Sequence, residues 1–246
     1  MKIIHLLFLL MTCFVMSCKK DPATAIVPAV TQGSLKLVFD NVVGTSDLKL
    51  NADKYLNAHG DTFSVSLFKY YISNVRLRRQ ADQVWVAFSS NNHLIEEGGK
   101  DNFTLSNIPV APYDMLEFEV GLDSATNFGT NFTEDLNKSK GMYWEWDPQY
   151  VFLKLEGKRY YNATNEALVF HIADNADLKT IQLPFKQTWY SGQTLVLQIK
   201  TDILKMFESP NQTDFTKVNN VMMGAEAANI ASNYSNMFTL TASKIE

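Results

Sequence analysis

Hydrophobic and polar residues alternate along much of the chain that follows Ser34. This period of two is found in four segments, 35–40, 63–68, 116–120 and 195–200. Such alternation is typical of strands that bury one face and leave the other in contact with water. Two apolar runs, VWVAF at 84–88 and YVFLKL at 150–155, predict further strands, and the connections are rich in Asn, Asp, Gly and Ser. The pattern therefore predicts an all-β fold, an antiparallel β-sandwich or barrel-like domain.

A period of three to four residues is found only near the C-terminus. The segment 201–210, TDILKMFESP, begins with residues that favour a helix N-cap and ends with a proline. In the segment 221–238, one helical face carries Met223, Ala227, Ile230, Tyr234 and Met237. We therefore expect one or two short C-terminal helices, with Met223 in the core and Met222 outside the buried stripe. A last short strand, FTLTAS, is expected to follow.

The first residues have the pattern of a bacterial export signal. Lys2 is followed by an apolar run that ends at Met16 and is too short to predict a membrane span, and VMSC at 15–18 resembles a lipobox. The resemblance implies cleavage before Cys18 and acylation of its thiol; the alternative is an ordinary signal peptide with an incidental cysteine. We therefore divide the chain into a signal peptide, 1–17, a tether, 18–31, and a β domain, 32–246. This predicts a lipid-anchored protein of the bacterial cell envelope, in the outer membrane and facing either the periplasm or the surface.

Composition and missing motifs exclude several classes of function. The chain is 46% hydrophobic and 20% charged, which is enough to build a core, and its net charge of -4 provides no basic surface for nucleic acid. Of its 2 cysteines, Cys13 lies in the predicted signal peptide and Cys18 in the lipobox, so no disulfide is expected. The chain has no phosphate-binding loop, dinucleotide fingerprint, zinc-protease motif or serine-hydrolase motif, and no set of acid, base and nucleophile is visible. We therefore expect no catalytic activity.

Histidine and methionine are the residues that could bind a metal ion. His59, His93 and His171 remain after the signal peptide, the first two beside turns and the third at the end of an apolar run. Imidazole suits copper and zinc, and thioethers such as those of Met142 and Met222 suit Cu(I). A single histidine or methionine nevertheless serves packing more often than it binds a metal.

The segment GMYWEWDPQYVFLKLEG, residues 141–157, holds two of the 4 tryptophans. On a strand, Met142, Trp144 and Trp146 share one face, and Asp147 and Pro148 form a turn. Three interpretations remain open: two anchors of a core strand, a flat platform on which sugars stack, or an electron-rich pair that is oxidised near a metal or a haem partner.

Several segments, in this order, resemble the family of the methanobactin-associated protein MbnP. They are FKYYISNVRL at 68–77, VGLD at 120–123 followed by NF at 127–128, the segment 141–157, FHI at 170–172 and the late ANIASNYSNMF. The resemblance covers most of residues 32–246, and its most specific part is Met-Tyr-Trp-x-Trp running into Leu-Glu-Gly.

This resemblance implies an exported copper-binding β-protein whose site depends on oxidation of a tryptophan to kynurenine. The oxidation is carried out by a dihaem cytochrome c peroxidase-like partner, MbnH, so that the chain is a substrate and catalyses nothing. Carried over to matching positions, either Trp144 or Trp146 is the oxidised residue, and we favour Trp144. The only contact with a membrane would be through the lipid on Cys18.

The resemblance also implies the metal ligands. His171 matches the histidine after the long strand, although this chain has Ile172-Ala173 where the family has x-Gly. His59, in the turn before the YYISN strand, is the second candidate. Many relatives have a histidine near the place of Val221-Met222-Met223, which makes Met222 a candidate soft ligand. His93 and Met142 are weaker candidates.

Three hypotheses make different predictions about the tryptophans. A copper-binding lipoprotein requires His59 or His171 near Trp144 or Trp146. A glycan-binding surface sandwich without a metal requires both indoles to be exposed on a flat face. A structural lipoprotein requires both indoles to be buried with no polar cluster beside them.

Overall fold

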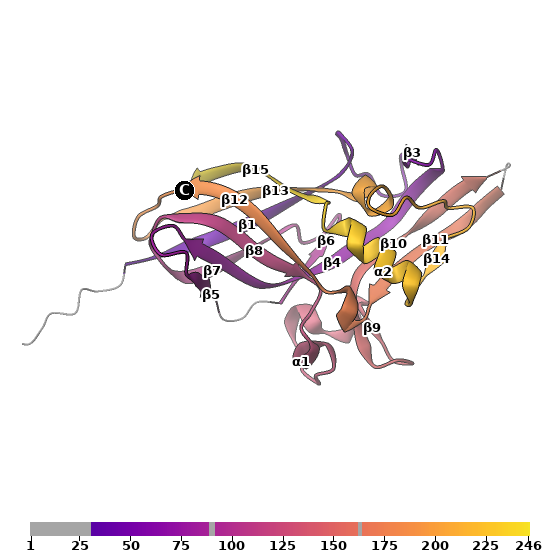
Figure 1. Ribbon diagram of the computed structural model, residues 1–246. Helices are drawn as coiled ribbons and strands as arrows, with labels where there is room; N and C mark the ends of the chain where they lie inside the picture. Colours follow the sequence, from indigo (N-terminus) through magenta and orange to yellow (C-terminus); the bar gives the residue numbers. More distant parts are fainter. Residues whose placement is uncertain (1–30, 89–91, 162–163) are drawn as a thin grey trace, which may run out of the picture.

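The chain folds into two β-sheets with a small helical lobe at one side, as the computed structural model in Figure 1 shows. The structure describes residues 31–88, 92–161 and 164–246, so the predicted signal peptide and Cys18 lie outside the described residues. Its strands are β1 (Gln32–Val43), β2 (Ser46–Asp47), β3 (Tyr55–Leu56), β4 (Thr62–Arg79), β5 (Trp85–Ala87), β6 (His93–Glu96), β7 (Asn102–Pro109), β8 (Tyr113–Val120), β9 (Tyr143–Trp144), β10 (Gln149–Tyr161), β11 (Thr164–Ala173), β12 (Lys179–Gln187), β13 (Thr194–Asp202), β14 (Asn220–Val221) and β15 (Phe238–Ile245). The helices are α1 (Ser124–Asn127) and α2 (Ala225–Tyr234), with 3-10 turns η1 (Glu134–Leu136), η2 (Lys138–Lys140), η3 (Asn175–Asp177) and η4 (Ile203–Phe207).

The two sheets confirm the prediction of an all-β, sandwich-like fold. One sheet has the order β12-β8-β4-β10-β11-β14, and β3, β5, β6 and β9 pair with its strands β4 and β10. The other has the order β15-β13-β1-β2, with β7 also paired to β1. Most pairs are antiparallel, but β1 pairs with β13 and β11 pairs with β14 in parallel. The alternation of side chains is the same for parallel and antiparallel strands, so the sequence pattern could not reveal these two pairs.

A β-bulge in β4 changes which residues face the core. Phe63 and Val65 are buried, as the alternation predicts, but the next buried residue is Phe68 and not Leu67. The register between β4 and β10 shifts at Gly157, where a Cβ would collide with the carbonyl oxygen of Ser64. Glycine at this position therefore permits the close backbone approach that the bulge requires.

The C-terminal helices differ in part from the prediction. In the segment 201–210, the first two residues end β13 and residues 203–207 form the 3-10 turn η4. Asp202 caps this turn by accepting a hydrogen bond from the backbone N–H of Leu204. Ala227, Ile230 and Tyr234 of α2 are buried as expected, whereas Met223 lies before the helix and is exposed, which corrects its predicted place in the core. No helix among the described residues is long and apolar enough to cross a membrane.

The lobe, residues 122–148, covers part of the outer face of the larger sheet, and in Figure 1 it lies below the sheets. Asp123 caps α1 by accepting from the N–H of Thr126. The fully buried Asn127 accepts a hydrogen bond of 2.8 Å from the N–H of Tyr150, whose hydroxyl donates to the carbonyl oxygen of Leu136 at 2.7 Å. These bonds fix the lobe to the start of β10.

Candidate functional site

The two neighbouring tryptophans lie at the edge of the lobe in different environments. β9 ends at Trp144, which pairs with Gln149, and residues 145–148 form the turn into β10. Trp146 therefore lies in the turn and not on the strand, yet the two indole rings pack against each other with centroids 5.1 Å apart and planes tilted by 35°. Trp144 is 9% exposed and Trp146 is 64% exposed. The structure thus matches neither a flat exposed platform nor a fully buried pair.

Trp144 belongs to a second apolar cluster, separate from the core between the sheets. This cluster joins the lobe to the outer face of the larger sheet and consists of Tyr71, Leu94, Leu122, Leu136, Met142, Trp144, Tyr150, Val151, Phe152 and Ala173. Met142, 1% exposed, is buried in the same cluster. Ala173 is two residues beyond His171 on β11, so that the cluster and His171 share one face of the sheet.

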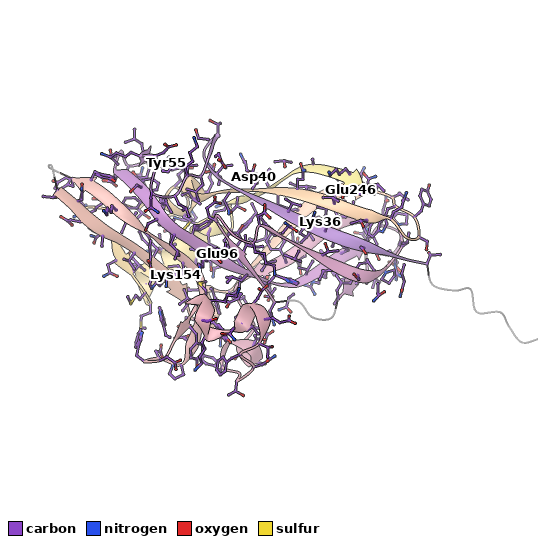
Figure 2. All side chains as sticks on the ribbon, turned by 180° about the vertical axis from the view of Figure 1, so that it is seen from behind. Lys36, Asp40, Tyr55, Glu96, Lys154 and Glu246 are labelled. Atoms are coloured by element: carbon purple, nitrogen blue, oxygen red, sulfur yellow. The ribbon has the colours of Figure 1, made fainter. Side chains whose placement is uncertain are left out.

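A row of polar residues, most of them charged, crosses the same face beside this cluster. Glu96 on β6, Lys69 on β4, Lys154 on β10 and His171 on β11 are opposite one another in the strand registers. The Nζ of Lys69 is 2.6 Å from Glu96 Oε1 and donates to the carbonyl oxygen of Lys140, and the Nζ of Lys154 donates to that of Gly141 at 3.1 Å. Figure 2 shows Glu96 and Lys154 close to the top of the lobe. The two lysines of this row therefore fix the backbone of residues 140 and 141, directly before the segment 142–146.

His171 ends this row with one ring nitrogen engaged and one free. Its Nε2 is 2.8 Å from Glu156 Oε1, and its Nδ1 is buried with no hydrogen-bond partner. Burial lowers the pKa of His171, against the opposing effect of Glu156, so the ring is neutral at pH 7. Burial acts to raise the pKa of Glu156, but the hydrogen bond from His171 and the ammonium of Lys154 bring it below its usual value. A neutral ring beside an ionised carboxylate donates through Nε2, which leaves the lone pair of Nδ1 available to a metal ion.

The short strand β14 brings Met222 to the side of His171. Val221 pairs with Phe170 in the parallel ladder, so the next residues, Met222 and His171, lie at neighbouring positions. Val221 and Phe170 both face the core, and alternation along β11 directs His171 to the opposite face. β14 ends at Val221, so Met222 lies in the bend that follows the strand. Met222 is 36% exposed. The backbones of these two predicted ligands, which lie far apart in the sequence, are thus close in the fold.

His59 lies elsewhere on the sheet. Thr62, just after it, is opposite Tyr160 on β10, whereas His171 is opposite Lys154, and these positions are separated by about 20 Å of strand at about 3.4 Å per residue. The ring of His59 contacts Asp61 at 3.2 Å and Asp214 at 3.8 Å, and these are the residues that form a group of three possible metal ligands in the described part of the chain. The structure therefore does not bring His59 to His171, Met222 or the tryptophans.

His93 is separated from both groups. Its ring stacks on Phe103 with centroids 3.7 Å apart, and its Nε2 is buried without a partner. Burial, helped by the charge of Lys100, lowers the pKa of His93 to about 4. The ring lines a cavity of about 690 Å³ with Lys100, Phe103 and Asp135, among others. His93 therefore has no second metal ligand of the predicted set beside it.

Sequence reasoning missed the residues that support His171. Lys154 and Glu156 are the two polar residues of the run VFLKLEG and fall on one face of β10. Polar residues at alternate positions of an otherwise apolar strand indicate a polar site on that face. Their partners, Lys69 and His171, come from other strands, and only the registers identify them.

A family model for MbnP matches residues 32–223 of the sequence. The chain belongs to the MbnP family. Membership of this family relates the chain to copper and to methanobactin, and its all-β fold is that of a solved relative. MbnP from Methylosinus trichosporium superimposes with a TM-score of 0.50 and 13% identity, over 80% of this chain and 82% of that one.

Other comparisons add little to this assignment. A suspected cell adhesion protein from Bacteroides eggerthii aligns with 6% identity over 87% of this chain and 55% of that one, and its TM-score of 0.24 is too low to support an argument. No curated protein matches the sequence.

Proposed function

We propose that this MbnP-family chain is an exported lipoprotein that binds copper at His171 after Trp144 has been oxidised to kynurenine. The observation that carries the proposal is the buried Nδ1 of His171 without a hydrogen-bond partner, which Glu156 leaves as a lone-pair donor on the face where the cluster of Trp144 also lies. A neutral imidazole and a thioether are ligands that Cu(I) prefers. The role is uptake or handling of copper, and the chain has no catalytic activity of its own.

Trp144, more than Trp146, suits the kynurenine position. Opening the indole pyrrole ring, with the loss of one carbon and the gain of one oxygen, leaves an aryl amine and a ketone. These groups can reach a metal only from a side chain that lies within the site. Trp144 is packed with Met142 and Ala173 at that face, whereas Trp146 faces water. The proposed oxidant is a dihaem cytochrome c peroxidase-like partner.

The other candidate ligands have lesser roles in this proposal. Met142 is buried in the same cluster as Trp144 and is a further candidate thioether. His59 and His93 take no part in this proposal. His59 contacts two carboxylates, and His93 stacks on Phe103 in a cavity away from His171. The proposed location is the cell envelope, with the chain anchored through a lipid on Cys18.

The test is a peptide mass for residues 141–157 of protein purified from its own host, followed by titration with Cu(I). The expected mass corresponds to kynurenine at Trp144 and an unmodified Trp146. Kynurenine at Trp146 alone would overturn the assignment of Trp144, and two unmodified tryptophans in protein that still binds copper would show that the site needs no oxidation. Two unmodified tryptophans together with no copper binding would refute the proposal.

A further inference from the structure

The contact between Trp144 and Trp146 joins a buried indole to an exposed one. Their ring centroids are 5.1 Å apart, with 9% of Trp144 and 64% of Trp146 exposed. A large oxidant that touches the surface reaches the ring of Trp146 readily and that of Trp144 hardly at all. We infer that Trp146 is a surface electron relay for Trp144. This inference rests on the proposed function, in which Trp144 is the residue that is oxidised.

The transfer needs no bond to form or break. A one-electron acceptor outside the protein, such as an oxidised haem of the partner, takes one electron from Trp146, and the oxidation state of the acceptor falls by one. The Trp146 radical cation then takes one electron from Trp144, and Trp146 returns to its starting state. One electron has left Trp144 and one has reached the acceptor, while both indole N–H protons stay in place.

The other two tryptophans lack the features of a relay. The guanidinium groups of Arg76 and Arg78 lie 5.0 and 5.8 Å from the ring of Trp85, and their positive charges oppose formation of a radical cation. Trp189 is fully buried. Trp146, in contrast, lies in the turn between Glu145, whose carboxylate is paired with Lys138, and Asp147, which accepts a hydrogen bond from the neutral amide of Gln149. The negative charge of Asp147 favours a radical cation on the neighbouring indole.

The tyrosines of the same cluster are poor competitors for the oxidation. Tyr150 and Tyr71 donate their hydroxyl hydrogens to the backbone carbonyl oxygens of Leu136 and Asp135. A tyrosine must lose its phenolic proton when it is oxidised, and a backbone carbonyl is too weak a base to take it. Burial raises the pKa of Tyr150 to about 12 and also raises that of Tyr71, which makes the proton still harder to remove. The indole pair is therefore oxidised in preference to Tyr71 and Tyr150.

The relay can be tested without the partner and without copper. The probe is tris(bipyridine)ruthenium(III), a bulky one-electron oxidant generated by light with a cobalt(III) ammine as the sacrificial acceptor. Oxidation of each aromatic residue is measured by peptide mass spectrometry in the unmodified wild-type chain, in Trp146→Phe and in the matched control Trp85→Phe. Phenylalanine keeps an exposed ring at 146 but is far harder to oxidise than an indole.

We expect Trp144 to be oxidised in the wild type and in Trp85→Phe. In Trp146→Phe its initial rate should be about tenfold lower, which corresponds to about 1.4 kcal/mol of barrier. Equal oxidation of Trp144 in the wild type and in Trp146→Phe would overturn the relay, as would preferential oxidation of Tyr71 or Tyr150 in the wild type. Because the probe replaces the partner, a negative result here leaves the host-protein mass, which tests the proposed function, unaffected.

Discussion

His171 on β11 and His59 in the turn between β3 and β4 have surroundings that give them different chemistry. His171 is buried, has one carboxylate neighbour, Glu156, and keeps a nitrogen without a partner. His59 is exposed in a turn beside two carboxylates, Asp61 and Asp214. Burial and a single hydrogen bond thus leave His171 with a lone pair that has no partner. The ring of His59, in contrast, contacts two carboxylates that have other hydrogen-bond partners.

The carboxylates beside the two histidines also have different hydrogen-bond and ion-pair partners. Asp61 accepts hydrogen bonds from the Nδ2 of Asn57 and the N–H of Phe215, and Asp214 is 2.9 Å from the Nζ of Lys217. These contacts connect the turn of His59 to the chain around residue 214. Glu156 is engaged by His171 and Lys154. The comparison teaches that the first site is arranged around a buried nitrogen without a hydrogen-bond partner and the second around a contact between loops.

Replacing each histidine by glutamine should give the largest difference between the sites. In protein that carries kynurenine, His171→Gln removes the proposed ligand and should weaken Cu(I) binding by at least about 100-fold, whereas His59→Gln should leave it within about threefold. Competition with a chromophoric Cu(I) chelator measures both affinities, and circular dichroism checks that each variant is folded. Equal losses in the two variants would mean that the metal site includes His59.

Replacing the carboxylates should separate metal binding from stability. Glu156→Gln should weaken Cu(I) binding by about 10- to 100-fold, because Nε2 loses the anionic acceptor that sets the tautomer of His171. Asp61→Asn should leave copper affinity unchanged and lower the free energy of unfolding by about 1–3 kcal/mol, because an amide cannot accept all the hydrogen bonds that Asp61 receives. Urea denaturation measures the second effect. A loss of copper affinity in Asp61→Asn would contradict this division of roles.

The third histidine tests, with a smaller effect, whether burial alone keeps an imidazole neutral. The pKa of His93 is lowered to about 4 in the folded chain and is about 6.5 in the unfolded chain. Between these values the unfolded chain binds a proton that the folded chain does not, so the free energy of unfolding falls as the pH falls from about 6.5 towards 4. After allowance for partial exposure of the ring, this loss is about 1–2 kcal/mol.

His93→Gln should remove that part of the pH dependence. The measurement is the free energy of unfolding of wild type and variant at several values between pH 7 and pH 4. Loss of the stacking on Phe103 lowers the stability of the variant at every pH, so the slope with pH is the quantity to compare. Asp177, whose pKa burial raises to about 6, contributes a slope of the opposite sign in both proteins and cancels from the difference. Identical slopes would show that His93 is not held neutral.

The parts of the fold that depend on neighbours in sequence were predictable. Alternation located β1, β4, β8 and β13, and the apolar runs located β5 and β10. The helix prediction placed Ala227, Ile230 and Tyr234 correctly but failed for Met223, since α2 starts at Ala225, beyond Met223. A period gives the buried face only while the element continues, and it does not show where the element starts or ends.

The candidate site was only partly predictable for the same reason. The segment around Trp144 and Trp146 and the residues His171 and Met222 could be named from the sequence, because their residue types and order are local information. That Trp144 is buried and Trp146 exposed depends on a turn that begins at Glu145, one residue after the strand ends. Glu156 and Lys154 were not predicted as partners of His171.

The sequence alone thus determined an all-β chain, a family and a short set of candidate ligands. The tertiary structure decided which candidates come near one another: the parallel pairing of β14 with β11 brings the backbone of Met222 near that of His171, and the register of β4 with β10 separates His59 from both. Strand registers are set by contacts between residues far apart in the chain and by bulges such as the one at Gly157. A period of two is the same for every register, so no pattern along the chain could select the one that forms this site.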